Sequence, residues 1–526
     1  MHRRSVLATS ALLAAAGLSR PALSQSARIL RFVPEADLAV LDPIWTTSSQ
    51  TTQHAFLVYD TLFGLDAGFQ PQPQMIQGFT AEDGGRTWRL SLRDGLSFHD
   101  GTPVLARDCV ASIRRWGRRD PFGQALLAAS DEIAAPDDRT ILLRMKYPFP
   151  VPTALGKSTA NVCAIMPERL AATDAFRQVP EVVGSGPFRF RADERVPGAR
   201  VVYERNPAYQ PRGDGTVSGS AGPKVAHFDR VEWSIMPDPA TAAAAIQTGE
   251  IDWLLTPNAD LVDGLRRRRD VAVRVLVSAG AVSCMRFNQL QPPFDNPALR
   301  RALLPAVNQA DYMVAVNGDD RARWRDGVGF FSPGTPMASA AGMEALTGPR
   351  SLDAAKRALS VGGYKGERVV LLGPADVPYA KILADVTADL FTRLGLNLDY
   401  QTMDWGTLVQ RRAKTEPVAD GGWSVFQTNW PGPDQANPAA HVFLRANGRD
   451  AAPGWPTSPK LEELRDSWLR TDGLAEQKRI AEAMQLQAFA DVPYIPLGQS
   501  ISPSALRADL KDVVEGQAVF WNIKRG

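Results

Sequence analysis

The stretch Leu90–Val110, LSLRDGLSFHDGTPVLARDCV, contains the pattern of a strand followed by the pattern of a helix. Apolar and polar residues alternate up to Leu92, which predicts a half-buried strand. Two Asp-Gly pairs then predict turns, and Thr102 followed by Pro103 predicts the cap and the first residue of a helix. Apolar residues recur at helical spacing as far as Trp116. The stretch therefore predicts an α/β fold.

The same stretch sets His99 beside Asp100, a pair that resembles a catalytic or metal site. Leu96 and Phe98 predict a returning strand, on which neighbouring side chains point to opposite faces. His99 and Asp100 would then be badly placed to share one substrate or ion. We expect a structural turn at this pair.

The composition excludes a protein that depends on a strong overall charge. Of the 526 residues, 59 are Lys or Arg and 57 are Asp or Glu, so no net field would attract nucleic acid or an anionic membrane. The run Arg266–Arg269 is the one local candidate for a phosphate or nucleic-acid site. Because Asp260, Asp263 and Asp270 surround it, a solvated helix end is the better interpretation.

A chain of this length predicts two to four folded units.

Residues 1–27 have the pattern of an export signal. Arg3 and Arg4 precede the apolar run Val6–Leu18, which is shorter than the roughly 20 residues that span a bilayer. The paired arginines favour a twin-arginine signal, with the ordinary secretory route as the alternative. No cysteine follows the run, so we expect no lipid anchor and a soluble protein in the periplasm.

Export would permit disulfides, but three cysteines allow one at most. We expect Cys109, Cys163 and Cys284 to be buried as small apolar side chains.

The rest of the chain alternates between strand and helix patterns, which is typical of an α/β protein with more than one lobe. The patterns predict strands at Arg139–Met145 and Ile251–Leu255, and a turn into a strand at Gly184–Phe190. They predict helices at Thr241–Gly249, Leu352–Leu359, Tyr379–Leu394 and Glu476–Phe489.

Motifs of enzymes are missing from the sequence. It contains neither a phosphate-binding G-x-x-x-x-G-K-[ST] nor a G-x-S-x-G nucleophile elbow, and its 5 histidines never stand at metal-ligand spacing. We therefore expect no catalytic residue, no metal and no cofactor.

Tryptophans gather in one part of the chain, at Trp405, Trp423, Trp430 and Trp455. The segment from Trp423 to Pro438, WSVFQTNWPGPDQANP, combines aromatic residues with an acid, Asp434. Such a loop can stack on a ligand and hold one cationic group. The alternative is that the tryptophans pack in the core.

Six blocks of the sequence resemble, in order, the extracellular solute-binding proteins of family 5, the peptide and nickel binding subunits of ABC importers. The blocks are Tyr59–Asp66, Thr87–Arg115, Gly184–Phe190, Ala245–Trp253, Met285–Leu303 and Asp491–Gln499. They cover nearly the whole chain after the signal.

The resemblance implies a two-lobed, type II-like periplasmic-binding-protein fold with an extra subdomain beside the first lobe. The first lobe would comprise residues 28–50, 181–277 and 490–526. The extra subdomain would comprise residues 51–180, and the second lobe residues 278–489. Two crossing strands would form the hinge.

The resemblance also implies a ligand site between the lobes. In the first lobe the ligand segment would be Thr46–Gln50, with Thr47, Ser48 and Ser49. In the second lobe the site residues would be Trp405, Trp423, Phe426, Trp430 and Asp434. Peptide binders of the family receive the α-amino group of the ligand on an aspartate three residues after a tryptophan. Here Asp434 stands four residues after Trp430.

The sequence as a whole predicts a monomeric binding protein that is not an enzyme. It would deliver a small organic solute, most simply a di- or oligopeptide, to an ABC permease with separate ATPase subunits. The alternatives are a secreted hydrolase and a family member for a non-peptide ligand, namely a nickel chelate, an opine or a sugar.

Overall fold

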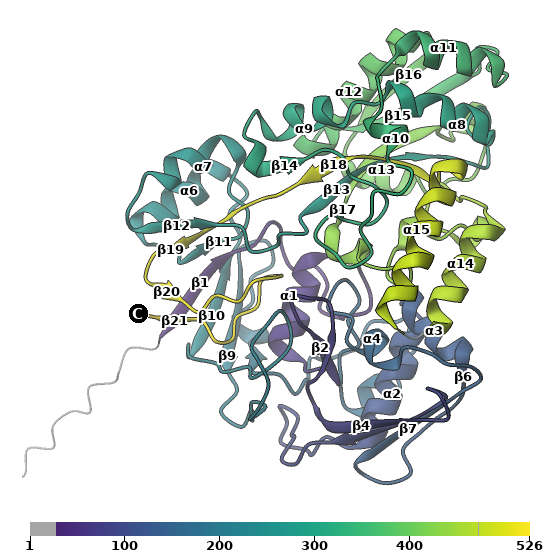
Figure 1. Ribbon diagram of the computed structural model, residues 1–526. Helices are drawn as coiled ribbons and strands as arrows, with labels where there is room; N and C mark the ends of the chain where they lie inside the picture. The colour runs from purple at the N-terminus through teal and green to yellow at the C-terminus, as the bar shows by residue number, and fades with distance from the viewer. Residues whose placement is uncertain (1–27, 472) are drawn as a thin grey trace, which may run out of the picture.

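The computed structural model describes residues 28–471 and 473–526, so the expected signal at residues 1–27 lies outside the described residues. Two large sheets form the centres of two lobes, and a four-stranded sheet forms a subdomain beside them (Figure 1). The expected α/β fold with two lobes and an extra subdomain is confirmed. No helix in the described part of the chain is long and apolar enough to cross a membrane.

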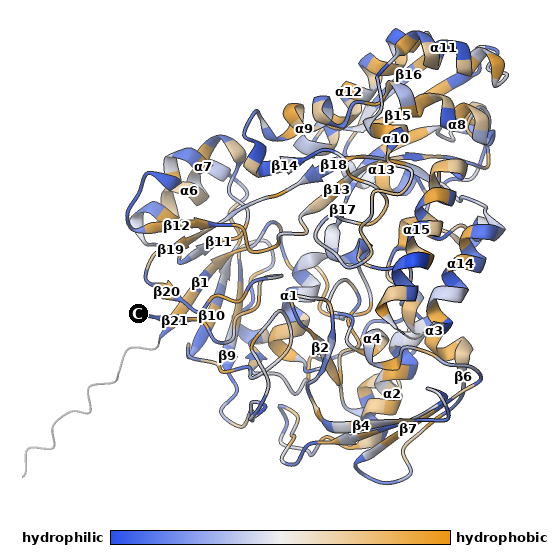
Figure 2. Cartoon of the chain, in the orientation of Figure 1, coloured by the Kyte–Doolittle hydropathy of each residue, from blue (hydrophilic) through white to orange (hydrophobic). Residues whose placement is uncertain are grey.

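The first lobe is built on a seven-stranded sheet. Its strands, in spatial order, are β12 (Val271–Arg274), β19 (Ser504–Arg507), β11 (Trp253–Leu254), β1 (Ile29–Val33), β10 (Arg230–Ser234), β9 (Arg200–Arg205) and β8 (Phe188–Phe190). Helices α1 (Ser49–Val58), α6 (Pro239–Thr248) and α7 (Ala259–Arg266) pack on it. The strands are mainly hydrophobic in Figure 2, and Phe32 is fully buried between Trp233 and Trp253. Apolar burial therefore holds this sheet together.

The second lobe is built on a six-stranded sheet. Its strands, in spatial order, are β14 (Trp324–Arg325), β18 (Tyr494–Ser500), β13 (Ala281–Phe287), β17 (Val425–Pro431), β15 (Arg368–Pro374) and β16 (Asn397–Met403). Its helices are α8 (Pro297–Leu303), α9 (Gln309–Asn317), α10 (Glu344–Thr347), α11 (Leu352–Val361), α12 (Pro378–Leu394), α13 (Trp405–Arg411), α14 (Pro459–Arg470) and α15 (Leu474–Asp491).

The subdomain has an antiparallel sheet with the order β4 (Ile76–Glu82), β5 (Thr87–Leu92), β7 (Thr140–Met145) and β6 (Ser130–Ala134). Helices α2 (Ala106–Gly117), α3 (Pro121–Ala129), α4 (Val151–Leu155) and α5 (Glu168–Ala171) accompany it. Two small pairs complete the described strands: β2 (Phe63–Leu65) with β3 (Pro71–Pro73), and β20 (Leu510–Lys511) with β21 (Lys524–Arg525).

The stretch that opened the sequence analysis folds partly as expected. Strand β5 ends at Leu92, but Leu96 and Phe98 form no strand, and only an isolated bridge joins Ser97 to Pro103. The expected helix begins later, at Ala106, because the Asp108 carboxylate accepts the N–H of Leu105 at 2.8 Å and so caps the helix there.

Thr102 does not cap the helix, which corrects the sequence-based expectation. Its hydroxyl and its backbone N–H both donate to the carboxylate of Asp100, at 2.6 and 3.0 Å. The second Asp-Gly pair thus forms a closed turn before the helix starts.

The chain crosses between the lobes twice. Strand β12 of the first sheet leads into β13 of the second, and β18 of the second leads into β19 of the first. The return to the first sheet thus follows Ser500, about ten residues after the expected boundary at 490. The start of the subdomain also differs, because Ala55 to Tyr59 in and after α1 belong to the core of the first lobe.

The two crossing segments touch at Gly280. A Cβ at this glycine, whose φ is +46°, would lie 2.2 Å from the carbonyl oxygen of Ser500 on the other segment. Only a residue without a side chain fits there, so Gly280 lets the two segments run side by side.

We predict that Gly280→Ala destabilises the protein more than Gly363→Ala. Gly363 also has a positive φ, +96°, but has open space around it. Gly363→Ala, the control, is expected to lower the free energy of unfolding by about 1–2 kcal/mol because of the backbone conformation alone. Gly280→Ala is expected to lower it by at least about 1 kcal/mol more because of the steric overlap. Urea unfolding measures both, and equal losses would contradict the close contact.

Helix α2 anchors the chain that leads into α1. The Arg115 guanidinium donates to both carboxylate oxygens of Asp42, at 3.0 and 2.7 Å, and the two side chains are 3% and 1% exposed. Asp42 also accepts the N–H of Val179 at 3.0 Å. This buried pair joins the helix of the opening stretch to the segment that precedes Thr46–Gln50.

We predict that Arg115→Ala destabilises the protein by about 3–5 kcal/mol, because it leaves the Asp42 carboxylate buried without its cation. Arg118→Ala, three residues further on at the end of the same helix, is the control. Its partner Asp174 lies 3.3 Å from a guanidinium that is 53% exposed, so a loss of at most about 1 kcal/mol is expected. Thermal unfolding at pH 7 compares the two variants, and similar losses would contradict the prediction.

Candidate ligand site between the lobes

Strand β17 forms the wall of the candidate site. Its side chains alternate, so Phe426, Thr428 and Trp430 point to one face of the sheet. On the other face, Gln427 donates to the Thr387 hydroxyl of α12 at 3.1 Å. The opposite face is covered at Phe426 by α13, whose Leu408 packs in one cluster with Phe426 and Leu372.

A short 3-10 turn, Gly432–Gln435, follows β17 and positions Asp434. The Gly432 N–H donates to the carbonyl of Gly280 at 2.7 Å, and a Cβ on Gly432 would lie 1.8 Å from the carbonyl oxygen of Ala279. Glycine is therefore required at this position. The turn that carries Asp434 is thus tied directly to the first crossing segment.

Asp434 is buried where the second lobe meets the subdomain. Its side chain is 4% exposed and faces the Thr159 hydroxyl and the Ala160 N–H. Lys157 is near enough to act on it, but its ammonium is bound to Asp120 and to the carbonyl of Ala160. Among the described residues, no cation forms an ion pair with Asp434 within 4.0 Å.

Burial raises the pKa of Asp434 to about 6, and the charge of Lys157 opposes the shift only in part. The ionised carboxylate is therefore held at a cost in free energy near neutral pH. A cationic group placed beside it would remove that cost.

The four clustered tryptophans divide into two groups. Trp423 is fully buried and packs with Phe426 and Trp455, at ring-centroid distances of 5.1 and 5.9 Å. This is the packing role that the sequence left open, and it leaves Trp423 and Phe426 without free surface. Trp405 and Trp430 remain half-buried, and Trp430 stacks on Phe443 at 4.7 Å.

The first-lobe segment is placed at the start of α1. Thr47 and Ser49 are exposed, and the Ser48 hydroxyl donates to Gln50 Oε1 at 2.7 Å. Within the described residues, no hydrogen bond or ion pair joins Thr46–Gln50 to the second lobe. Among the described residues, the segment thus forms no hydrogen bond with Asp434.

Three residues that the sequence analysis did not single out lie beside the same wall. Tyr379, at the start of α12, points its hydroxyl at Thr428 and Asn429, and burial raises its pKa. The charges of Glu35 and Arg412 both act on this hydroxyl. Glu35 follows β1 in the first lobe, so Tyr379 marks a place where the lobes face each other. No motif in the sequence distinguishes these residues, because they meet only in the folded chain.

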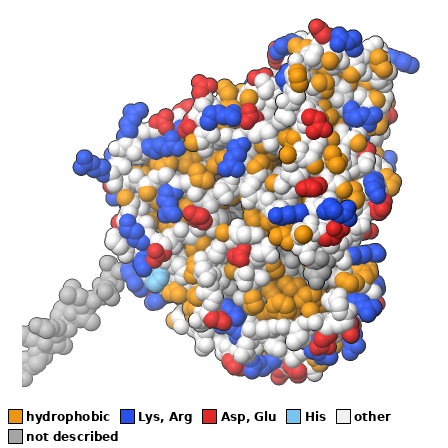
Figure 3. All heavy atoms as spheres, in the orientation of Figure 1, with side chains coloured by type: hydrophobic (Ala, Val, Ile, Leu, Met, Phe, Trp, Pro, Cys, Tyr) orange, Lys and Arg blue, Asp and Glu red, His pale blue; other side chains and the backbone are white. Residues whose placement is uncertain are grey.

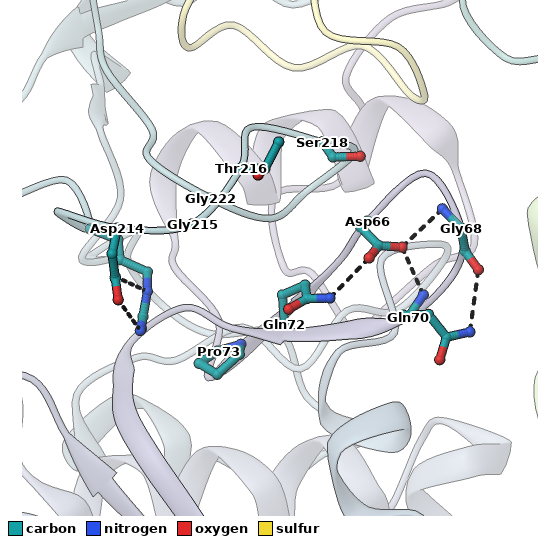
Figure 4. A pocket seen from close by; sticks show the side chains of 11 residues that line it. Asp66, Gly68, Gln70, Gln72, Pro73, Asp214, Gly215, Thr216, Ser218 and Gly222 are labelled. Atoms are coloured by element: carbon teal, nitrogen blue, oxygen red, sulfur yellow. Dashed lines mark hydrogen bonds and ion pairs between the residues drawn. The ribbon is translucent and has the colours of Figure 1, made fainter. Parts of the chain in front are cut away.

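An open hollow with a volume of about 630 Å³ lies elsewhere (Figure 4). Its polar side chains are bonded to one another: Asp66 accepts from Gln72 at 2.9 Å, and Arg212 pairs with Asp214. None of the candidate ligand residues lines it. We therefore do not assign the ligand to this hollow.

The residues that first suggested chemistry have structural roles. His99 Nε2 lies 3.1 Å from the carbonyl oxygen of Gly186, and burial lowers the pKa of His99 to about 4, so its ring is neutral. All three cysteines are buried and free, as expected. In the described part of the chain, no three potential metal ligands cluster.

The arginine run is a solvated helix end. Arg266 pairs with Asp263 and Asp320 at 3.3 Å each, and Arg268 pairs with Asp270 at 2.9 Å. Charged side chains of both signs are scattered over the face shown in Figure 3. The face offers no continuous basic surface.

A model of the bacterial extracellular solute-binding proteins of family 5 (middle region) matches residues 70–450. The chain belongs to this family. Among curated relatives of this family 5 protein, a probable peptide ABC transporter periplasmic-binding protein of Sinorhizobium fredii is 37% identical over 99% of both chains. A glutathione-binding protein of Pectobacterium atrosepticum is 25% identical over 86% of this chain and 85% of its own.

Solved structures share the fold of this family 5 protein. The binding protein AgaA of A. tumefaciens R10, in complex with agropinic acid, has a TM-score of 0.78 at 18% identity and covers 95% of this chain and 99% of its own. The binding protein DppA of Helicobacter pylori, in complex with the peptide STSA, has a TM-score of 0.76 at 20% identity, with 94% and 98% covered.

We predict that Asp434→Asn stabilises the ligand-free protein at pH 7.5. The pKa of Asp434 in the folded protein, about 6, lies above its ordinary value of 3.8. The ionisation of Asp434 therefore lowers the free energy of unfolding as the pH rises through about 6. Replacing the carboxylate by a neutral amide removes that loss, which is on the order of 1–3 kcal/mol. Urea unfolding at pH 7.5 and pH 4.5 measures it, with the gain expected only at the higher pH. A destabilised variant at pH 7.5 would contradict the prediction.

Proposed function

We propose that this chain captures a short peptide, or a similar small organic solute, between its lobes and delivers it to an ABC permease with separate ATPase subunits. Residues 1–27 would direct export, and the mature protein would act in the periplasm as a monomer that breaks no bond in its ligand. The peptide relative and the peptide complex among the similar structures support this class of ligand.

The observation that carries the proposal is the unpaired carboxylate of Asp434. A buried carboxylate without a cation is unfavourable, and such sites are kept where a ligand supplies the missing charge. The α-amino group of a peptide is such a charge. The half-buried ring of Trp430, four residues earlier in the chain, stacks on Phe443 and keeps part of its apolar surface exposed.

Closure follows from the same arrangement. Asp434 belongs to the second lobe, whereas Lys157, Thr159 and Ala160 belong to the subdomain that faces it. A ligand that contacts both sides binds the closed state better than the open one and so shifts the population toward closure. A hinge at residues 275–280 and 501–503 would allow the change. The closed form would then report occupancy to the permease.

A ligand screen tests the class of function. Native mass spectrometry of the purified protein with a mixture of peptides, glutathione and opines is expected to show one intact ligand per chain. A bound opine in place of a peptide would revise the solute class, in line with the agropinic acid complex of AgaA. Cleaved peptides would favour the alternative of a secreted hydrolase.

We predict that Asp434→Asn weakens binding of an amine-bearing peptide by at least about 1.5 kcal/mol, roughly tenfold, because a charge-assisted hydrogen bond is lost. Calorimetry at pH 7.5 measures the affinity. An unchanged affinity would remove Asp434 from the site.

Two control variants accompany this measurement. Asp420→Asn removes an exposed carboxylate from the same lobe, and His99→Ala removes the ring that bonds to Gly186. Both are expected to leave the affinity unchanged, since neither side chain faces the site.

A further inference from the structure

Helix α7 of the first lobe is joined to the second lobe by two ion pairs. The Arg266 guanidinium of α7 lies 3.3 Å from the Asp320 carboxylate, which precedes a 3-10 turn, Arg321–Arg323, in the second lobe. In the opposite sense, the Arg323 guanidinium of that turn lies 3.2 Å from the Asp263 carboxylate of α7. The turn leads into β14, which lies next to α7 in Figure 1. Each lobe therefore gives the other one cation and one anion at this place.

The four side chains form a closed ring of alternating charge. Within α7, Asp263 lies 3.3 Å from Arg266, and within the second lobe Asp320 lies 3.3 Å from Arg323. Each charge thus has one oppositely charged neighbour in its own lobe and one in the other lobe. An isolated ion pair at a surface contributes little, whereas several charges in a network contribute more. The ring therefore joins the lobes more strongly than either pair alone would.

Hydrogen bonds hold the second-lobe side of the ring in place. The Arg323 side chain is only 11% exposed and also donates to the carbonyl of Ala259, in α7, at 2.9 Å. The Asp320 carboxylate accepts the N–H of Ala322 at 3.0 Å. The Arg323 carbonyl accepts the N–H of Ile501, in the second crossing segment, at 2.7 Å. The ring is thus attached to the hinge, and its side chains have little freedom to follow a change in the angle between the lobes.

The ring is assembled while the lobes are closed. In the same structure Asp434 of the second lobe faces Thr159 and Ala160 of the subdomain across from it. A rotation about the crossing segments moves α7 relative to the turn Arg321–Arg323, because the two belong to different lobes. The two pairs between the lobes cannot both keep their distances during this rotation. Opening therefore removes an attraction that the closed state has.

We propose that this ring is an electrostatic clasp, which stabilises the closed arrangement and makes the closed population depend on ionic strength. The Arg266 and Asp320 side chains are 41% and 37% exposed, so dissolved ions reach the ring and screen it. The clasp acts in the ligand-free chain and so goes beyond the proposed function. Any ligand of the closed form gains affinity as the closed population rises. Arg266, the first residue of the arginine run, thereby acquires a role in closure.

Small-angle X-ray scattering of the ligand-free protein tests the dependence on salt. At about 10 mM salt the Debye length is about 30 Å, and the wild type is expected to scatter mainly as the closed structure. At about 1 M salt the Debye length falls to about 3 Å, which screens the ring. The radius of gyration is then expected to rise as molecules open.

Charge inversion separates the attraction from the other contacts of the same side chains. Asp320→Arg combined with Arg323→Asp keeps an ion pair inside the second lobe but makes both pairs with α7 repulsive. At low salt this double variant is expected to lower the ratio of closed to open molecules at least about fivefold, since each exposed pair contributes a factor of roughly 1.5 to 5. Adding Asp263→Arg and Arg266→Asp inverts the whole ring, restores all four attractions, and is expected to return the ratio toward that of the wild type.

Arg268→Gln is the matched control for a change in the same arginine run. Arg268 pairs with Asp270 at 2.9 Å inside the first lobe and does not reach the second. Its scattering is expected to equal that of the wild type at both salt concentrations. Circular dichroism shows whether each variant is folded before its scattering is compared.

The outcomes separate the clasp from the proposed function. A wild type with one radius of gyration at both salt concentrations would overturn the clasp. So would a fully inverted ring that stays as open as the double variant, because the opening would then come from lost hydrogen bonds and not from the charges. A chain that opens with salt but binds no peptide keeps the clasp and loses the proposed function, whereas a chain that binds peptide and ignores both salt and charge inversion does the reverse.

Discussion

The rest of the structure depends on the two segments that cross side by side between the lobes. Their contact at Gly280 and Ser500 leaves no room for a side chain, and both segments continue into paired strands at each end. The N–H of Gly432 donates to the carbonyl of Gly280, two residues before Asp434. The turn that carries the Asp434 carboxylate is thus hydrogen-bonded directly to the first crossing segment. The position of Asp434 therefore depends directly on the path of the first crossing segment.

A buried carboxylate without an ion-pair partner marks the turn after β17. A folded chain normally pairs its buried charges, because an isolated one destabilises the fold. This chain does so at Arg115 and Asp42, and it surrounds Arg286 with carbonyls. Asp434, in the turn that follows β17, is an exception to that rule. Violations of local rules gather at functional sites, where a ligand restores what the fold omits.

The sequence predicted the elements whose signals are local. Helix α6 ends at Gly249 in the left-handed conformation, as its glycine indicated, and α12 has the expected apolar face. The start of α2 was predicted three residues too early, because the cap depends on Asp108 inside the helix and not on Thr102 before it. For the candidate site, the resemblance to the family pointed to Asp434, although it stands four residues after Trp430 and not three. Tyr379 and Arg412 could not be found, because the partners that define their roles lie in other parts of the chain.

The density of tryptophans in this region reflects core packing for two of the four residues. Trp423 and Trp455 pack beneath the site, in a cluster with Phe426 and Leu408, and present little surface to a ligand. Their contribution is a dry apolar floor, on which the Trp405 and Phe426 rings support the Arg412 guanidinium. The buried aromatic residues thus keep water from one side of the Arg412 guanidinium.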